Sequence, residues 1–309
     1  MGTIKECKSL VTYFKQSSLN SKLQKSLKQE VETRWNSKLE MLESINDQFE
    51  EISDLLSERD ELDKIGSIDS NILQILINFL RKFREASDFL EGSKYPTLHM
   101  VIPWYKILIN HCQVNISDND ALIQLKTVVG QIIVNKLKIE NIYKIAVFFN
   151  PKMKQLKILE QSDALWVKDQ IKQQCANLIS QFTNDESDNS TNTVQERPTK
   201  RSRKEAKEIT DFSQYYDSSS EEEEEDEVDQ YLKLKAPKDK NLDLLQWWND
   251  HKNEYPALAV LCAYYLSIPA SSASSEREFS ATGQTINERH TNLNPETVDS
   301  ILILHSSLQ

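Results

Sequence analysis

Glu276 is the carboxylate whose setting in the sequence best suits chemistry. It follows the run of small residues Ser271–Ser275 and precedes Arg277 at the start of a predicted helix. A carboxylate in the first turn of a helix can act as a ligand, or it can simply stabilise the helix by about 0.3–1 kcal/mol. Mg²⁺ needs several ligands in near-octahedral geometry, so one carboxylate cannot hold a pair of these ions. Glu276 therefore needs partners before it can act.

A basic cluster lies at residues 197–204. Its charges that could bind an import receptor are Lys200, Arg201, Arg203 and Lys204. Such a cluster on an exposed segment is typical of a nuclear import signal. It could also contact DNA phosphates, or it could be an ordinary solvated run of charge. We predict nuclear import, and hence a nuclear protein.

An acidic run follows at Glu221–Glu227. It would repel DNA and attract basic proteins, or it would only keep the chain soluble. Large apolar residues nearly vanish between about residues 183 and 232. Ordering such a stretch costs about 1–2 kcal/mol per residue, which little burial can offset. The sequence therefore predicts a disordered linker, taken as residues 183–240.

The rest of the composition favours a helical globular protein. The chain has 309 residues, 39% of them hydrophobic, and only five glycines, which favours helices over turn-rich sheets. The net charge is −11, but the acidic run alone supplies seven negative charges. A nucleic-acid binder usually shows a basic excess instead. The scattered cysteines and histidines predict no metal site, and no apolar run suggests a membrane partner.

Apolar residues recur at helical spacing along the first 182 residues. Leu42, Ile45 and Ile52 lie on one face of a helix predicted over 38–57, and Ile72 opens a similar series over 72–90. We expect these two helices to pair as an antiparallel hairpin, because isolated helices are marginal in water. Further helices are predicted over 104–111 and 118–137, and a helix end is predicted within 142–149. Asp118 or Asn119 would cap the helix over 118–137, and its inward residues would be Leu122, Leu125, Val129 and Ile132. A last helix would run from a Ser162 cap to Phe182.

Three segments resemble hAT-family transposases. The longest runs from Trp247 to Leu304 and contains Ser267–Ala270 followed by Glu276-Arg277, which is similar to the C-terminal dimerisation region of that family. The others are Thr33–Ser37 and Ala146–Lys154. The resemblance implies a mainly α fold, with a helical insertion-like region at 1–182, the linker at 183–240, and a dimerisation region at 241–309. The last helices would belong to a truncated RNase H-like core.

The resemblance also assigns a catalytic role to Glu276. In the family this Glu completes a triad with two aspartates, and two Mg²⁺ ions then drive phosphodiester cleavage. This chain matches the family only after the second aspartate and shows no BED-type zinc finger. We therefore expect no enzyme activity, a vestigial Glu276, and no cofactor, with Mg²⁺ relevant only to a full-length transposase.

Arg34 and Trp35 would contact DNA if the resemblance holds there. The family's tryptophan is associated with stacking on a flipped base, an interaction that contributes about 1–3 kcal/mol per base. The arginine would neutralise a phosphate. A tryptophan near a helix start can equally be a core residue with Arg34 as its surface partner.

The apolar C-terminal region predicts a homodimer or homo-oligomer. Aromatic-rich patches are typical of association surfaces, although the same residues could form an intramolecular core. The residues predicted to mediate dimerisation are Trp247, Trp248, Phe279, Val298, Ile301 and Leu302.

Three functions fit this pattern. The first is a non-catalytic, transposase-derived nuclear protein that self-associates and retains some DNA binding. The second is a fragment of an active transposase. The third is an acidic nuclear adaptor that binds basic proteins through the segment 183–232.

Overall fold

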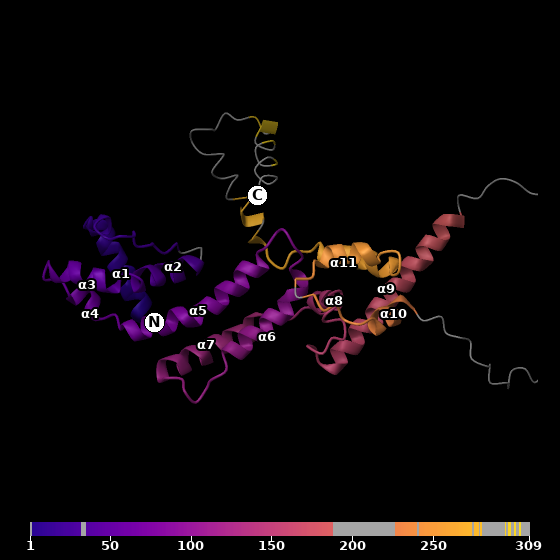
Figure 1. The fold of residues 1–309 in the computed structure, drawn as a ribbon, viewed down its shortest axis with the longest axis horizontal. Coiled ribbons are helices and arrows are strands. Elements are labelled where there is room, and N and C mark those ends of the chain that lie inside the picture. Colours follow the sequence, from indigo (N-terminus) through magenta and orange to yellow (C-terminus); the bar gives the residue numbers. More distant parts are fainter. Residues whose placement is uncertain are drawn as a thin grey trace, which may run out of the picture. The chain divides into compact units, whose positions relative to one another are not determined.

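The computed structural model describes residues 2–31, 35–187, 226–239 and 241–273, together with 275–277, 279, 294, 296, 297, 300 and 303. Within these ranges every regular element is a helix and no strand occurs (Figure 1). The predicted mainly α fold class is confirmed, and the RNase H-like relationship of the last helices stays a prediction.

The helices fall into two compact units. Unit 1 comprises residues 1–143 and 268–309, and unit 2 comprises residues 144–267. Unit 2 therefore takes helices from both the predicted insertion-like region and the predicted dimerisation region. The α-helices of unit 1 are α1 (Gly2–Gln16), α2 (Trp35–Asn46), α3 (Phe49–Ser57), α4 (Asp63–Gly66), α5 (Ser70–Leu90), α6 (Val101–His111) and α7 (Asp120–Lys136). The next helix, α8 (Asn141–Phe148), leads into unit 2, which continues with α9 (Gln161–Ser187), α10 (Glu227–Lys233), α11 (Leu244–His251) and α12 (Pro256–Leu266).

The predicted packing of the two helices is confirmed in part: α2, the first part of the helix predicted over 38–57, packs against α5, and α3 and α4 lie between them in the chain. Leu42 and Ile45 of α2 share a buried cluster with Leu73 and Ile77 of α5. One predicted position is wrong: Ile72 is 36% exposed, and the neighbouring Leu73 is buried instead. The apolar face of α5 is therefore rotated by about one residue from the predicted one at its start.

The helix predicted over 38–57 is interrupted and forms α2 and α3. The interruption lies at Asp47 and Gln48, where the backbone N–H of Gln48 bonds to the Ile45 oxygen, three residues back, at 3.2 Å. The Gln48 side chain is buried; its Nε2 donates to the Ser44 oxygen at 3.0 Å and its Oε1 accepts from the Lys25 N–H at 3.0 Å. The buried amide thus satisfies backbone groups at the junction.

The helix predicted over 118–137 is confirmed as α7. Asn119 is its cap, with Oδ1 accepting the N–H of Leu122 at 2.9 Å. The inward face differs at one position, because Ile132 is 49% exposed whereas Ile133 is buried. The predicted cap of α9 is corrected as well: the helix begins at Gln161, so Ser162 already lies inside it.

The end of α8 anchors the C-terminal helices of unit 2. The Tyr231 hydroxyl of α10 donates to the Phe148 oxygen at 3.1 Å, and the Trp248 indole N–H of α11 donates to the Phe149 oxygen at 2.8 Å. The last carbonyls of a helix have no partner within the helix. Two side chains from distant parts of the sequence therefore complete the C-terminal end of α8.

Lys154 makes the reciprocal connection from the segment after α8. Its side chain is buried, and Nζ donates to the carbonyl oxygens of Tyr231 and Leu234 at the end of α10. The same Nζ lies 4.7 Å from the centroid of the Tyr231 ring. Burial lowers the pKa of Lys154 to about 8, whereas the two carbonyl oxygens favour the charged form.

The structure corrects the predicted linker over 183–240. Residues 183–187 continue α9, and residues 227–233 form α10, whose Tyr231 is fully buried. Asp226 caps α10 by accepting the N–H of Asp229 at 2.8 Å. The acidic composition of this segment did not indicate α10, a short amphipathic helix that packs against α9. Residues 188–225 and 240 of the predicted linker lie outside the described residues, and the described residues 234–239 belong to no helix.

The substitution Lys154→Met tests this anchor. At pH 7 we expect the free energy of unfolding to fall by about 1–3 kcal/mol, because two buried carbonyl oxygens lose their charged donor. The pKa of Lys154 rises from about 8 in the folded protein to its ordinary 10.5 on unfolding. The unfolded chain therefore binds more protons between these values, so the stability of the wild type rises with pH in that window.

Urea unfolding followed by tryptophan fluorescence measures both effects. The difference between wild type and Lys154→Met should widen from pH 8 to pH 10.5. Lys157 is exposed near Lys154, and Lys157→Met should change the stability by less than about 0.5 kcal/mol. A difference that stays flat or shrinks across this window would contradict the buried-amine assignment.

Candidate functional site

The outer face of α12 is the strongest candidate for an association site. α12 has eleven residues, PALAVLCAYYL, and none of them is charged. A helix that is hydrophobic all round is normally buried on every side. Among the described helices, none is long and apolar enough to cross a membrane. The apolar face that α12 does not bury in its own unit therefore calls for another explanation.

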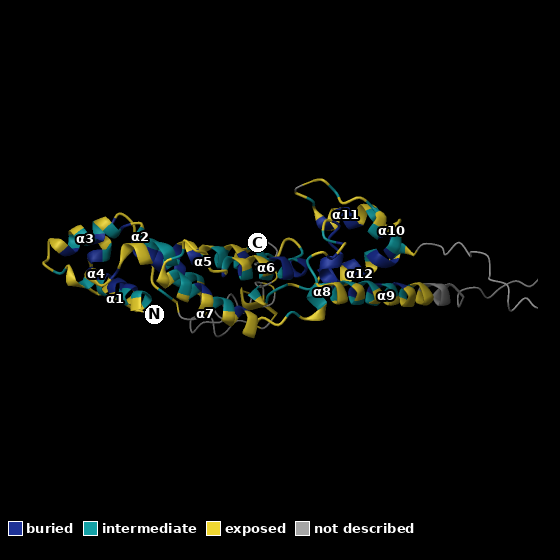
Figure 2. Cartoon of the chain, turned by 90° about the horizontal axis from the view of Figure 1, so that it is seen from below, coloured by how far each residue is buried: buried dark blue, intermediate teal, exposed yellow. Residues whose placement is uncertain are grey.

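One side of α12 is already used inside unit 2. Leu258, Leu261 and Cys262 are buried, and α12 packs against α9, as the dark blue positions beside α9 illustrate (Figure 2). The Tyr265 hydroxyl donates to the Gln174 Oε1 of α9 at 3.0 Å. These contacts fix which way the helix faces.

The opposite side of α12 carries the exposed residues Val260, Ala263 and Tyr264 and ends at the exposed C-cap residue Ser267. We call these four residues, which follow one another at helical spacing, the α12 stripe. Tyr264 is 64% exposed and Val260 is 45% exposed. Positions three and four apart lie on one side of a helix. The stripe is therefore a continuous, mainly apolar strip on a rigid element.

Glu227 fixes the start of α12. Its carboxylate accepts the N–H of Ala257 at 3.2 Å and the N–H of Leu258 at 3.0 Å. The first amides of a helix lack partners within the helix and favour negative charge. Glu227 is the last residue of the acidic run. Its hydrogen bonds to the start of α12 are a structural role that the charge composition of the run does not predict. Lys172 of α9 adds ion pairs to Asp226 at 3.1 Å and Asp229 at 2.7 Å.

Trp247 and Trp248 do not lie on the α12 stripe or on any other exposed face. Both are buried in unit 2, where the Trp248 ring lies 5.8 Å from that of Phe149 and 5.2 Å from that of Tyr231. The Trp247 ring stacks on His251 at 3.9 Å. The prediction that these two residues mediate dimerisation is therefore corrected: their rings form the core of unit 2.

Glu276 lies in unit 1, in a short helical stretch. It is exposed, and its Oε1 accepts the hydroxyl of Ser272 at 2.7 Å. The neighbouring Arg277 donates to the Glu91 carbonyl oxygen at 3.1 Å. The described part of the chain contains no group of three or more His, Cys, Asp or Glu that could hold a metal ion.

The segment that precedes Glu276 is tied to the loop after α5. The backbone N–H of Ala270 donates to the hydroxyl of Thr97 at 3.0 Å, and Thr97 is almost fully buried. Together with the Arg277 contact, this bond holds the Ser267–Ala270 motif to residues 91–97. These two contacts give Ala270 and Arg277 a structural role within unit 1.

Two further predicted residues are exposed. Trp35 is the first residue of α2 and is 38% exposed, so the alternative that it is a core residue does not hold. Phe279 is 76% exposed. The remaining predicted site residues lie outside the described residues: Arg34, Lys200, Arg201, Arg203, Lys204, Val298, Ile301 and Leu302.

Sequence reasoning missed Tyr231, Lys154 and Glu227 as positioning residues. The spacing of Val228 and Tyr231, after the capping Asp226, is a helix-start pattern that could have indicated α10. The partner of Lys154 was not readable, because its contacts cross about 80 residues of sequence. No local pattern encodes such a distant pairing.

Comparison with known proteins agrees with this assignment of the C-terminal helices. Residues 227–308 match the model of the hAT family C-terminal dimerisation region. The match begins at the first residue of α10, earlier than the predicted boundary at 241. It therefore includes the Glu227 cap, α11 and the α12 stripe.

Relatives extend the similarity to the rest of the chain. The chain is 26% identical to the Transposable element Hobo transposase of Drosophila melanogaster, over 87% of the chain and 47% of that protein. It is 32% identical to the Zinc finger BED domain-containing protein DAYSLEEPER of Arabidopsis thaliana, over 30% of the chain and 14% of the relative. Zinc finger protein 618 of Mus musculus is 20% identical over 89% of the chain and 27% of its own length.

The chain thus spans about half of the Hobo transposase and smaller shares of the other two relatives. Residues 227–308 of this chain therefore match the hAT family C-terminal dimerisation region, and the chain is similar to a transposase over most of its length.

Proposed function

We propose that this chain is a non-catalytic, transposase-derived nuclear protein that self-associates through its C-terminal dimerisation region and retains contact with nucleic acid. The observation that carries self-association is the α12 stripe. It lies within the residues that match the family's dimerisation region, and it leaves apolar side chains in water on a helix without charged residues. Homodimerisation is the simplest way to cover it.

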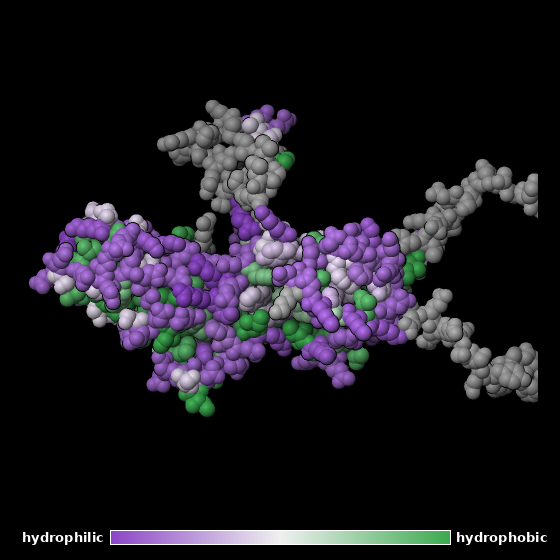
Figure 3. All heavy atoms as spheres, in the orientation of Figure 1, coloured by the Kyte–Doolittle hydropathy of each residue, from purple (hydrophilic) through white to green (hydrophobic). Residues whose placement is uncertain are grey.

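The occupant proposed for the stripe is a second copy of the same stripe. In a two-fold interface the same surface serves both subunits, so Val260 of one copy can meet Tyr264 of the other. Tyrosine suits such a position, because its ring is apolar and its hydroxyl can reach solvent at the rim. Most of the face drawn in Figure 3 is hydrophilic, with hydrophobic residues in separate patches. Localised stripes are therefore the places where association would begin.

The stripe alone is small for a stable interface, which usually buries about 800 Å² on each partner. Further exposed apolar residues occur in the matched region, namely Phe279 and Ile303, which are 76% and 67% exposed. We propose that these two residues also take part in self-association. Val298, Ile301 and Leu302 stay predicted dimerisation residues.

The non-catalytic part of the proposal is supported by the setting of Glu276. Its carboxylate is exposed and bonded to a serine hydroxyl, and the described residues hold no group of three or more His, Cys, Asp or Glu that could bind the metal ions of a two-metal site. The alternative is that the chain is part of an active transposase, which the similarity to about half of the Hobo transposase keeps open. In that case Mg²⁺ and further acidic residues would come with the longer protein.

Nucleic-acid contact is supported by Trp35, because an exposed indole can stack on a base. Nuclear localisation is supported by the basic cluster at Lys200, Arg201, Arg203 and Lys204, the kind of segment that an import receptor binds. The adaptor hypothesis stays a prediction. A deletion that tests it must spare Glu227, because this residue caps α12.

Tyr264→Glu tests self-association. The side chain is exposed in the single chain, so the substitution should leave the fold intact, while a buried charge at the interface should raise the dimer dissociation constant at least tenfold, or about 1.4 kcal/mol. Light scattering after size exclusion measures the mass. Ile132→Glu is the matched control, because Ile132 is an exposed apolar residue of α7 outside the matched region. A monomeric wild type, or equal masses for wild type and Tyr264→Glu, would contradict the proposal.

A nicking assay tests the non-catalytic assignment. The purified chain, incubated with linear and hairpin DNA duplexes in magnesium, should leave the strands intact, and Glu276→Gln should behave identically. Cleavage by the wild type that disappears in Glu276→Gln would instead assign the active-transposase function to this chain.

Substitution of Lys200, Arg201, Arg203 and Lys204 by alanine tests nuclear import. A fluorescent fusion of the wild-type chain should concentrate in the nucleus, and the quadruple variant should spread into the cytoplasm, because the receptor loses its basic contacts. The control replaces two exposed lysines of unit 1, Lys136 and Lys138, and should stay nuclear. Nuclear accumulation of the quadruple variant would rule out this signal.

A further inference from the structure

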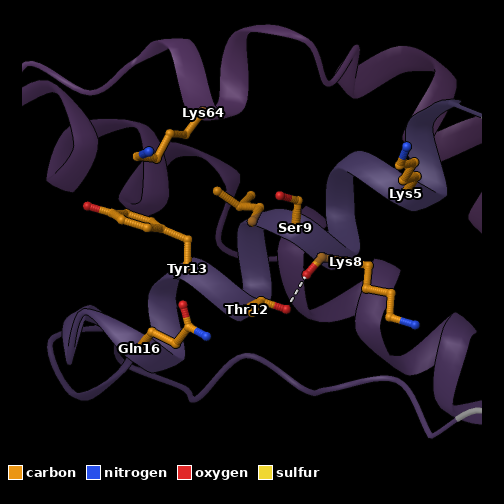
Figure 4. Close-up of a pocket in the computed structure, with 8 residues that line it drawn as sticks. Lys5, Lys8, Ser9, Thr12, Tyr13, Gln16 and Lys64 are labelled. Atoms are coloured by element: carbon orange, nitrogen blue, oxygen red, sulfur yellow. Dashed lines mark hydrogen bonds between the residues drawn. The ribbon is translucent and has the colours of Figure 1, made fainter.

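Unit 1 carries a basic hollow that the proposed function does not use. It lies between α1 and α4 and has a volume of about 480 Å³ (Figure 4). Its polar lining consists of Lys5, Lys8, Ser9, Thr12, Gln16 and Lys64. No acidic residue lines it, although the chain as a whole has 48 acidic and 37 basic residues.

The donors in this hollow are largely uncommitted. The side chains of Lys5, Ser9 and Gln16 make no hydrogen bond or ion pair with the described residues. Lys64 lies over the ring of Tyr13, with Nζ 4.3 Å from the ring centroid, and makes no ion pair there (Figure 4). An ammonium group held on an aromatic face keeps its protons available to a ligand.

The nearby carboxylates are already engaged. The Tyr13 hydroxyl donates to Glu61, which also lies 3.5 Å from the Arg59 Nε. Glu30 pairs with Lys38 at 3.2 Å and with Lys8 at 3.6 Å. The hollow therefore presents positive charge and hydrogen-bond donors, which suits an anionic ligand.

The arrangement is a row rather than a compact cradle. Residues 5, 8, 9, 12 and 16 follow one side of α1, and at about 1.5 Å per residue they extend over roughly 16 Å. A single free phosphate would occupy only part of such a row. Consecutive phosphates of a nucleic-acid strand, at about 3.4 Å per nucleotide along the axis, would occupy all of it.

The local charge agrees with a polyanionic ligand. Residues 1–38 contain eight Lys and Arg and three Asp and Glu, against the excess of acids in the whole chain. A basic stripe on one part of an acidic protein is the usual electrostatic footprint of nucleic-acid binding. The acidic total of the chain conceals this footprint.

The geometry points to this hollow as a binding site for the phosphate backbone of nucleic acid. Lys5 and Lys64 supply positive charge that no described carboxylate pairs with, and Ser9 and Gln16 donate hydrogen bonds to phosphate oxygens. Contacts of this kind position a duplex without selecting its sequence. The inference rests on the nucleic-acid contact of the proposed function and locates it on α1 and α4.

The test uses the full chain and a short fluorescent DNA duplex, with anisotropy measured between about 50 and 200 mM salt. Lys5→Glu/Lys64→Glu should weaken binding at least tenfold and reduce the slope of log affinity against log salt by about 2, because two phosphate contacts are lost. The matched control is Lys136→Glu/Lys138→Glu, which makes the same change in net charge elsewhere in unit 1. The control should bind within about twofold of the wild type.

Circular dichroism checks the fold of each variant. If Lys64→Glu disturbs the fold, Lys5→Ala/Ser9→Ala replaces it, because both side chains are exposed and make no hydrogen bond or ion pair with the part of the chain that the structure describes. Light scattering on the same samples separates this inference from self-association. A variant that no longer binds the duplex but keeps the molar mass of the wild type leaves the dimer proposal intact.

The inference is overturned if the wild type does not bind the duplex, if the hollow variant and the lysine control are weakened equally, or if the chain binds anionic phospholipid vesicles in place of the duplex. The inference is also overturned if inorganic phosphate displaces the duplex completely while chloride at the same ionic strength does not, because a single phosphate would then account for the site.

Discussion

The carbonyl groups at the end of α8 determine how unit 2 is assembled. Those of Phe148 and Phe149 accept hydrogen bonds from the Tyr231 hydroxyl and the Trp248 indole, and Lys154 returns a charged donor to the end of α10. Each partner completes a helix end that would otherwise leave buried polar groups unsatisfied. Helices separated by many residues in the sequence are thereby held in one orientation. Without these bonds the aromatic rings of the unit would still be apolar, but their packing would lack a fixed register.

This assembly decides which residues remain for a partner. Trp247 and Trp248 are buried in the core of unit 2. α12 is held in one orientation by Glu227 at its start and by its packing against α9 along one side. The only apolar face of α12 left in water is then the stripe with Val260 and Tyr264. Association through this region is therefore a consequence of how the core is satisfied, and the most apolar residues of the sequence are not the ones that face outward.

Much of the fold could be predicted from local pattern. The α2–α5 pairing and the Asn119 cap follow from helical spacing and from a side chain that bonds its own helix start. The helix at 227–233 could not be found from composition, because charge dominates its surroundings while Val228 and Tyr231 are its only large buried residues. The type of a residue predicts that its side chain is buried, but it does not predict which helix the side chain packs against.

The candidate sites illustrate the same limit. The aromatic side chains of Trp247 and Trp248 predict burial, yet a single sequence cannot distinguish burial in an internal core from burial in an interface between two copies. The basic hollow was missed for a different reason, since Lys5 and Lys64 lie on different helices and the acidic total of the chain masks them. Glu276 could be located from its motif, but its bond to Ser272 and the engagement of Arg277 by Glu91 depend on tertiary structure.

Tyr264 and Tyr265 are adjacent and identical in type, yet only Tyr265 faces the core of unit 2. Tyr265 is buried against the Phe149 ring at 5.6 Å, whereas Tyr264 is 64% exposed. Selection can therefore act on the two neighbours separately: one is constrained by the integrity of the monomer and the other only by what it meets outside. During divergence, such a helix can exchange one partner for another through a single codon while the protein that carries it stays folded.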